Sequence, residues 1–245
     1  MLALLALLLA SCTYLPNDFA VSGSVTESET RDAIVLVPTG GATHQHGFIF
    51  YPGALVDPHA YVPELSAVAA AGIPVVIAKL PGNLAVLSID AGLALRDRVP
   101  GMDGWVIGGH SLGGVMAAWS AYDNPDAYVG LVFFASYPSA STSLASWGHP
   151  VLSLSASDDG LATADKVGAA DIYLPSPQAS ATDLAAYSGL PPTDLTVHHV
   201  INGGNHAGFG SYGPQDGDGA ATITPEAQHA EVASFIEAFF TKQGW

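Results

Sequence analysis

The chain alternates between short, continuously apolar runs and longer segments whose apolar residues recur at helical spacing. Runs of the first kind, rich in β-branched residues, are typical of strands covered on both faces of a sheet. The expected strands are Ala33–Val37, Gly47–Tyr51, Pro74–Lys79, Trp105–Gly109, Val129–Ala135, Pro150–Ser155 and Thr196–Ile201.

The segments between these runs predict helices. The candidates are Tyr61–Ala71, Ser88–Arg98, Leu112–Tyr122, Ala162–Ala169 and Pro225–Phe240. The last one begins well, with Thr224 as an N-cap and Pro225 at the first helical position. It carries an apolar stripe on one face, formed by Val232, Phe235, Ile236 and Phe239.

Strands that alternate with helices indicate an α/β fold, with a mainly parallel central sheet and helices on both faces. In such sheets, functional residues gather at the carboxyl ends of the strands. The region Ser176–Asp194 is rich in Pro, Ser, Ala and Thr, and is predicted to be a surface excursion rather than a domain linker.

The N-terminus, MLALLALLLASC, is an apolar run that is too short to span a bilayer and is typical of a secretory signal. Its end, Leu9-Ala10-Ser11-Cys12, resembles the lipobox of bacterial lipoproteins, in which the signal is cut before a cysteine that then carries a lipid. No Lys or Arg precedes the run, so the positively charged start of such a signal is missing. An ordinary cleaved signal with a chance cysteine, or a frayed hydrophobic N-terminus, stays an alternative.

This pattern predicts three parts of the chain. Residues 1–11 form a signal peptide, residues 12–31 a polar tether, and residues 32–245 the folded domain. On this interpretation the protein is exported, with Cys12 as the lipidation site that anchors it to the bacterial cell envelope. The lipid would be its only link to a membrane.

Composition supports a single globular domain. The 245 residues are 49% hydrophobic and 11% charged, with 22 Asp and Glu against 6 Lys and Arg. The net charge of −16 argues against nucleic acid as a partner and against electrostatic binding to an anionic membrane, because both need clustered cations.

The stretch Gly104–Trp119, GWVIGGHSLGGVMAAW, presents Ser111 within G-x-S-x-G, after an expected strand and before an expected helix. A nucleophile at such a sharp turn has a strained backbone, and side chains in place of Gly109 or Gly113 would collide with the neighbouring elements. The turn also directs the Leu112 N–H toward a reacting carbonyl oxygen.

A serine needs a base, and the base needs an acid that orients it. Asp158 and Asp159 follow the expected strand Pro150–Ser155, and Asp159 is favoured of the two because the Asp-Gly-Leu turn brings it inward. His206 follows the last expected strand in a glycine-rich loop. None of the other eight histidines has that context; His110 is expected to face away from the serine.

A second oxyanion donor is expected in the loop after an early strand. In FIFYPGALV, Gly53 permits close approach, and the N–H of Ala54 or Leu55 is the donor, with Ala54 favoured.

With these residues placed, the chain resembles the α/β-hydrolase superfamily, and more narrowly a group of short bacterial members without a large cap domain. The stretches that carry the resemblance are YPGALVDPHAYVPE, PVVIAKLPGNLAVL, GGHSLGG, SDDGLAT and GGNHAGFGSYGPQDGDGAATIT. The resemblance implies Ser111 as nucleophile, Asp159 as acid and His206 as base. The chain departs from the group's pattern at Asp171–Asp194, a segment that is longer than expected.

The predicted function is carboxyl-ester hydrolysis through an acyl-enzyme, without a cofactor, on small or surface-presented esters. Tyr137–Pro150, where larger relatives insert a cap, is too short for one, which predicts a shallow and accessible site. Acyl transfer, amide cleavage and a catalytically silent binding lipoprotein remain alternatives. The sequence does not indicate an oligomeric state.

Two further motifs do not complete a metal site. Asp216-Gly217-Asp218-Gly219 is similar to a calcium loop but lacks the later carboxylate that such a loop requires. His44-Gln45-His46 has no nearby Cys or acidic cluster. No metal is therefore predicted.

Overall fold

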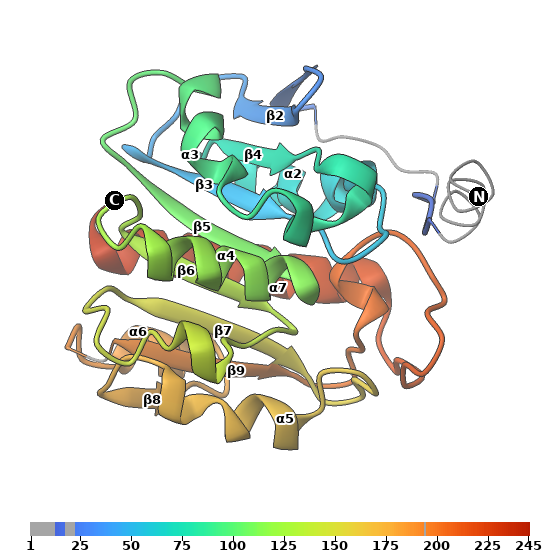
Figure 1. Cartoon of the computed structure of the whole chain (residues 1–245), viewed down its shortest axis with the longest axis vertical. Helices are drawn as coiled ribbons and strands as arrows, with labels where there is room; N and C mark the ends of the chain where they lie inside the picture. Colours follow the sequence, from blue (N-terminus) through green and yellow to red (C-terminus); the bar gives the residue numbers. More distant parts are fainter. Residues whose placement is uncertain (1–12, 18–22, 194) are drawn as a thin grey trace.

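The computed structural model describes residues 13–17, 23–193 and 195–245, and in this part nine strands form one sheet (Figure 1). The spatial order is β1-β2-β4-β3-β5-β6-β7-β9-β8. Strands from β4 to β8 in this order pair in parallel, whereas β2 is antiparallel to both β1 and β4. The strands are β1 Val25–Glu29, β2 Ala33–Pro38, β3 His46–Tyr51, β4 Val75–Ala78, β5 Gly104–His110, β6 Gly130–Phe134, β7 Val151–Ala156, β8 Gln178–Ser180 and β9 Thr196–Ile201.

All seven expected strands are present, and the structure adds one at each edge of the sheet. β1 lies inside the segment predicted as a polar tether, and β8 lies inside the predicted surface excursion. In β1 only Val25 is buried and the other four residues are exposed. Edge strands tolerate polar residues because they bury little surface, so the apolar pattern gave no signal for either strand.

The helices follow the expected order, with shifted ends. They are α2 Val62–Ala70, α3 Ala91–Leu95, α4 Leu112–Asp123, α5 Ala164–Ala169, α6 Leu184–Gly189 and α7 Pro225–Gln243. Thr224 caps α7, since its side chain accepts a hydrogen bond from the Ala227 N–H. The expected helix Ser88–Arg98 is shorter, with α3 followed by a 3-10 turn at Arg96–Arg98. α6 was not predicted.

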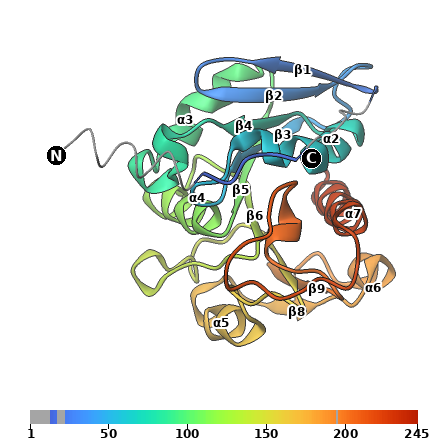
Figure 2. The same cartoon turned by 90° about the vertical axis from the view of Figure 1, so that its right-hand side faces the viewer.

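Two layers of helices cover the sheet, as Figure 2 shows from the side. Phe48 and Phe50 of β3 point to one face and pack in the cluster that includes α2 and α7. Ile49 and Tyr51 point to the opposite face and pack with α3 and α4. This alternation explains why the central strands are apolar throughout, because each residue meets a helix layer on one side or the other. The expected stripe on α7 is buried.

The fold is therefore α/β, with a mainly parallel sheet between helices and no large cap, as predicted. Tyr137–Pro150 contains one short 3-10 turn, Ala140–Thr142, which leaves the carboxyl edge of the sheet uncovered by a further domain. No helix within the described residues is long and apolar enough to cross a membrane. Cys12 and the predicted signal lie outside the described residues.

Candidate active site

Ser111 lies between β5 and α4, at the carboxyl end of a central strand. Its backbone has φ 52° and ψ −124°, a conformation that side chains rarely adopt and that costs about 1–3 kcal/mol. Two hydrogen bonds hold the turn: the Ser111 N–H donates to the Phe134 carbonyl (3.0 Å), and the Ser136 hydroxyl donates to the Ser111 carbonyl (2.7 Å). The strain fixes the hydroxyl at the edge of the sheet.

Close packing around this turn explains its glycines. A Cβ on Gly109 would lie 2.6 Å from the Tyr51 carbonyl oxygen and 2.8 Å from the Gly114 nitrogen. A Cβ on Gly113 would collide with the backbone oxygens of Tyr51 and Pro52. Because these neighbours are backbone atoms, they cannot rotate away, and the collisions expected from the sequence are present.

The predicted acid and base meet across two loops. Asp159 follows β7 and His206 follows β9, and the Asp159 Oδ2 lies 2.8 Å from the His206 Nδ1. The Asp159 Oδ1 accepts hydrogen bonds from the N–H groups of Leu161 and Ala162, both at 2.7 Å. Both side chains are buried, at 0% and 1% exposure. The carboxylate thus holds a proton on Nδ1 and leaves Nε2 as the basic nitrogen.

Of the two candidate acids, Asp158 and Asp159, only Asp159 has a described contact with His206. Asp158 lies half-buried on the other side of the turn, where its oxygens receive long contacts from Ser157 (3.3 Å) and Thr222 (3.5 Å). Its side chain makes no contact with His206 among the described residues. Asp159 is therefore the carboxylate that orients the imidazole.

Ser111 and His206 line one small pocket of about 250 Å³. The other lining residues are Leu112, Val115, Ala135, Ser136, Tyr137, Leu161 and Ala162. The His206 Nε2 is buried and has no hydrogen-bond partner in the described part of the chain, so the Ser111 hydroxyl is not bonded to it in this conformation. Such bonds often form only when substrate closes the site. The arrangement leaves an unused base in a pocket shared with a hydroxyl.

The two backbone N–H groups predicted as oxyanion donors have no described hydrogen-bond partner. In the loop after β3, the Gly53 N–H donates to the Tyr61 hydroxyl (3.0 Å) and the Leu55 N–H to the Asn83 carbonyl (2.8 Å). Among the described residues, no partner exists for the N–H of Ala54 between them. The N–H of Leu112, first in α4, has none either. Of the two donors considered in this loop, Ala54 is thus the one that is free.

His110, which was expected to face away from the serine, does not line the pocket of Ser111 and packs against His206. Its ring centroid lies 4.4 Å from that of His206, and its Nδ1 lies 2.8 Å from the Tyr61 hydroxyl. Complete burial, aided by the nearby His206, holds the pKa of His110 well below its usual value. The neutral ring of His110 therefore packs against the ring of His206.

Tyr61 is a site neighbour that the sequence did not reveal. Its hydroxyl accepts from the Gly53 N–H and is hydrogen-bonded to the His110 Nδ1, which joins the loop of Ala54 to the end of β5, next to Ser111. Burial raises its pKa, so the hydroxyl keeps its proton. Nothing in the spacing of a tyrosine at the start of a helix signals this contact.

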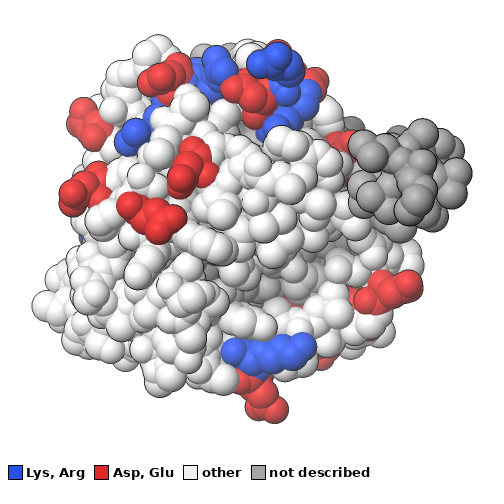
Figure 3. All heavy atoms as spheres, viewed as in Figure 1, with Lys and Arg blue, Asp and Glu red and all other residues white. Residues whose placement is uncertain are grey.

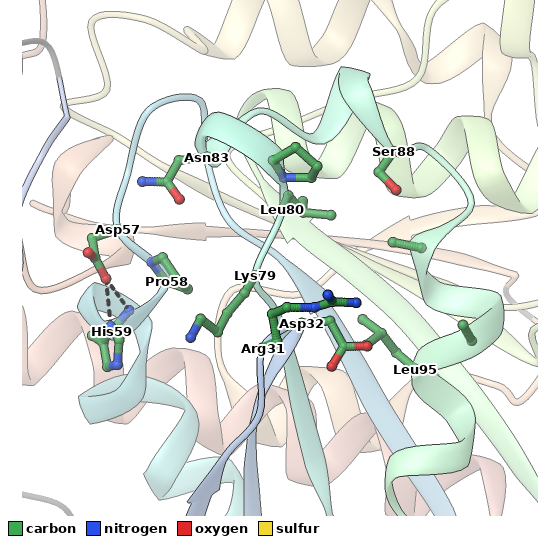
Figure 4. A pocket seen from close by; sticks show the side chains of 13 residues that line it. Arg31, Asp32, Asp57, Pro58, His59, Lys79, Leu80, Asn83, Ser88 and Leu95 are labelled. Atoms are coloured by element: carbon green, nitrogen blue, oxygen red, sulfur yellow. Dashed lines mark hydrogen bonds and ion pairs between the residues drawn. The ribbon is translucent and has the colours of Figure 1, made fainter. Parts of the chain in front are cut away.

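A larger hollow, of about 700 Å³, lies at the end of β4 and next to α3, and Figure 4 shows it from close by. Arg31, Asp32, His59 and Lys79 line it, together with apolar residues such as Leu80, and none of the predicted triad residues does. Elsewhere the face drawn in Figure 3 is mostly uncharged. No group of three or more His, Cys, Asp or Glu that could hold a metal ion occurs within the described residues.

A family model described as "Alpha/beta hydrolase family" matches residues 47–230, a span that contains Ser111, Asp159 and His206. None of the curated protein sequences matches the chain.

Solved structures share the fold at low sequence identity. An arylesterase structure is 14% identical, with a TM-score of 0.54, and the match covers 98% of this chain and 90% of that one. A dienelactone hydrolase-like promiscuous phosphotriesterase from metagenomic libraries is 16% identical, with a TM-score of 0.60 and coverage of 89% and 99%. Est1E from Butyrivibrio proteoclasticus is 12% identical, with a TM-score of 0.55 and coverage of 90% and 98%.

Proposed function

We propose that this chain, which belongs to the alpha/beta hydrolase family, hydrolyses carboxylic esters through an acyl-enzyme formed on Ser111. One observation carries the proposal. Asp159 lies 2.8 Å from the His206 Nδ1, the His206 Nε2 has no described hydrogen-bond partner, and Ser111 and His206 line the same pocket. A buried, oriented and unused base beside a strained serine is the arrangement that nucleophilic catalysis requires.

The proposed reaction has two halves. The Ser111 hydroxyl attacks the ester carbonyl while His206 Nε2 takes its proton, and Asp159 stabilises the resulting imidazolium. The N–H groups of Leu112 and Ala54 stabilise the oxyanion, and His206 then returns the proton to the departing alkoxide. In the second half, His206 activates a water molecule, which releases the acid and restores Ser111. No cofactor takes part in these steps.

The pocket suggests which esters fit. At about 250 Å³ it is smaller than the roughly 300–1,000 Å³ of typical ligand pockets. Leu112, Val115, Tyr137 and Leu161 give it largely apolar walls. We therefore propose a short acyl group, on a water-soluble or surface-presented ester, as the substrate. The names of two structural neighbours, an arylesterase and Est1E, agree with ester chemistry.

The test is a series of p-nitrophenyl esters of increasing acyl length. We expect turnover of the acetate and butyrate esters and a steep fall toward dodecanoate, because a long chain has no room in the pocket. Ser111→Ala should lose activity by about 10⁴-fold or more. The matched control is Ser188→Ala, at an exposed serine on α6, which should behave as wild type. Equal activity of wild type and Ser111→Ala would refute the proposal.

We also propose that the protein is exported and anchored through a lipid on Cys12, on the strength of the Leu9–Cys12 motif. Growth of expressing cells with a palmitate analogue should label the wild-type protein and leave Cys12→Ser unlabelled. Absence of label from wild type would remove the lipid anchor but leave the hydrolase proposal intact.

A further inference from the structure

The loop Asp216–Gly219, which is similar in sequence to a calcium loop, lies between the acid and base loops. Its Asp218 carboxylate accepts four backbone hydrogen bonds. Oδ1 receives the N–H groups of His206 (3.1 Å), Gly160 (3.2 Å) and Gly219 (2.8 Å), and Oδ2 receives that of Ala207 (2.8 Å). One side chain thus contacts the residue after the acid and the base itself.

The loop of Asp159 and the loop Asp216–Gly219 can approach closely because glycines lie at their contact. A Cβ on Gly160 would collide with the Gly217 oxygen, and one on Gly219 would collide with the Asp158 oxygen. A further bond, from the Asn205 Nδ2 to the Gly219 carbonyl (2.8 Å), fixes the same loop from the side of β9. The D-G-D-G sequence therefore serves a close backbone contact, in which Asp218 reaches both catalytic loops at once.

We infer that Asp218 is a positioning residue, whose carboxylate fixes the loops of Asp159 and His206 relative to each other. This inference rests on the proposed function. The 2.8 Å contact between Asp159 and His206 spans loops from two different strands. Two other bonds join the loops farther from these residues: the Asp158 N–H donates to the Gly204 carbonyl (2.9 Å), and the Gly203 N–H donates to the Ser157 hydroxyl (2.8 Å). Asp218 bonds the backbone of both loops at His206 itself and at Gly160, the residue after the acid. If it is altered, the imidazole can tilt, and even an error of about 1 Å is able to cost on the order of 100-fold in rate.

Asp218 also adds a negative charge beside His206. Three titratable groups contact this histidine or its backbone among the described residues: Asp159, His110 and Asp218. His110 is neutral, because burial lowers its pKa. The two carboxylates are therefore the negative charges beside this histidine, and Asp218→Asn removes one of them.

The test compares Asp218→Asn with Asp216→Asn in the full chain. The first change leaves shape almost intact but removes the charge and places an amide N–H₂ against a backbone donor. The second removes the same charge from an exposed residue that forms no hydrogen bond or ion pair in the described structure. We expect kcat/KM for p-nitrophenyl acetate to fall roughly 10- to 100-fold in Asp218→Asn. The loss should persist when the rate is expressed per active site titrated with a fluorophosphonate, which a loss of folded protein alone would not produce. Asp216→Asn should match wild type.

The inference is overturned if folded Asp218→Asn retains the wild-type rate per active site. Cooperative melting of each variant shows that it is folded. Should Asp218→Asn not fold, Asp218→Glu keeps the charge but shifts the acceptors, and it should still lose at least about tenfold in rate; the wild-type rate would overturn the inference. If neither variant folds, hydrogen exchange of the backbone amides is measured in wild type. Slow exchange at His206 and Ala207 supports the positioning role of Asp218, and exchange as fast as in open loops contradicts it. An inactive wild-type protein would instead count against the proposed function.

Discussion

The two halves of the site are held by different means. On the acid–base side, hydrogen bonds to side chains predominate: Asp159 accepts three and Asp218 accepts four. On the nucleophile side, Ser111 stands on a strained turn wedged by glycines. There the N–H groups of Ala54 and Leu112 have no partner within the described residues.

The difference agrees with the role that we propose for each half. A base is useful only in one orientation, so its partners are satisfied and fixed before substrate arrives. An oxyanion hole is useful only while its donors are unoccupied, so that half must be held by packing instead. Polar substitutions should therefore damage the acid–base side, and steric substitutions should damage the nucleophile side.

The largest effect is expected from Asp159→Asn. The amide can leave His206 in the wrong tautomer, with its proton on Nε2, so kcat should fall by about 10⁴-fold. Steady-state kinetics with p-nitrophenyl acetate measures the loss. The neighbouring Asp158→Asn is the matched control and should stay within about threefold of wild type, given its long contacts. A greater loss in Asp158→Asn than in Asp159→Asn would exchange the two assignments.

Gly113→Ala tests the packed side. Its new methyl group would meet the backbone oxygens of Tyr51 and Pro52, so the nucleophile turn must shift. We expect activity to fall by about 100-fold and the free energy of unfolding by about 1–3 kcal/mol. Gly168→Ala, in α5 with no atom within 4 Å of the new methyl, should instead stabilise by about 0.5–1 kcal/mol. Wild-type activity in Gly113→Ala would show that packing does not hold this half.

Tyr61→Phe tests the link between the halves. It leaves the Gly53 N–H and the His110 Nδ1 without their partner, so we expect a loss of about 1–3 kcal/mol in unfolding free energy. Activity should fall by about tenfold, as the loop of Ala54 loosens. The control is Tyr187→Phe, because the Tyr187 hydroxyl is buried without a partner in the described structure. The unfolding free energies are measured with denaturant. Equal losses in Tyr61→Phe and Tyr187→Phe would contradict the proposed role of the Tyr61 hydroxyl in joining the two halves.

The smallest effect on catalysis is expected from Glu64→Met in α2. Both carboxyl oxygens of Glu64 are buried without a described partner, and burial raises its pKa well above the usual value. The folded state thus holds a proton that the unfolded state releases above pH 4.5. Wild type should lose stability as pH rises, by up to about 1.4 kcal/mol per unit, until the folded pKa is reached.

Glu64→Met should remove this part of the pH dependence, becoming more stable than wild type at pH 8 but not at pH 4. Turnover of p-nitrophenyl acetate at pH 7 should be unchanged, since Glu64 contacts neither half of the site. Parallel unfolding curves for the two proteins at both pH values would disprove the assignment.

The features that depend on local sequence, namely the inner strands and the turn at Ser111, could be predicted. Apolar runs revealed the seven inner strands, and a glycine on either side of Ser111 revealed the turn. The edge strand β1 escaped because four of its five residues are exposed. The contacts of Asp218 and Tyr61 could not be predicted for another reason. Both residues contact loops that are distant in the sequence, and the spacing of residues does not indicate such contacts.

The central claim is that Ser111 is a nucleophile served by His206, and covalent trapping tests it most directly. The folded wild-type protein is incubated with a fluorophosphonate, and its intact mass and peptides are measured. The account predicts one adduct per chain, located on Ser111, absent from Ser111→Ala and formed far more slowly by Asp159→Asn. A folded wild-type protein that gains no adduct on Ser111 would contradict it.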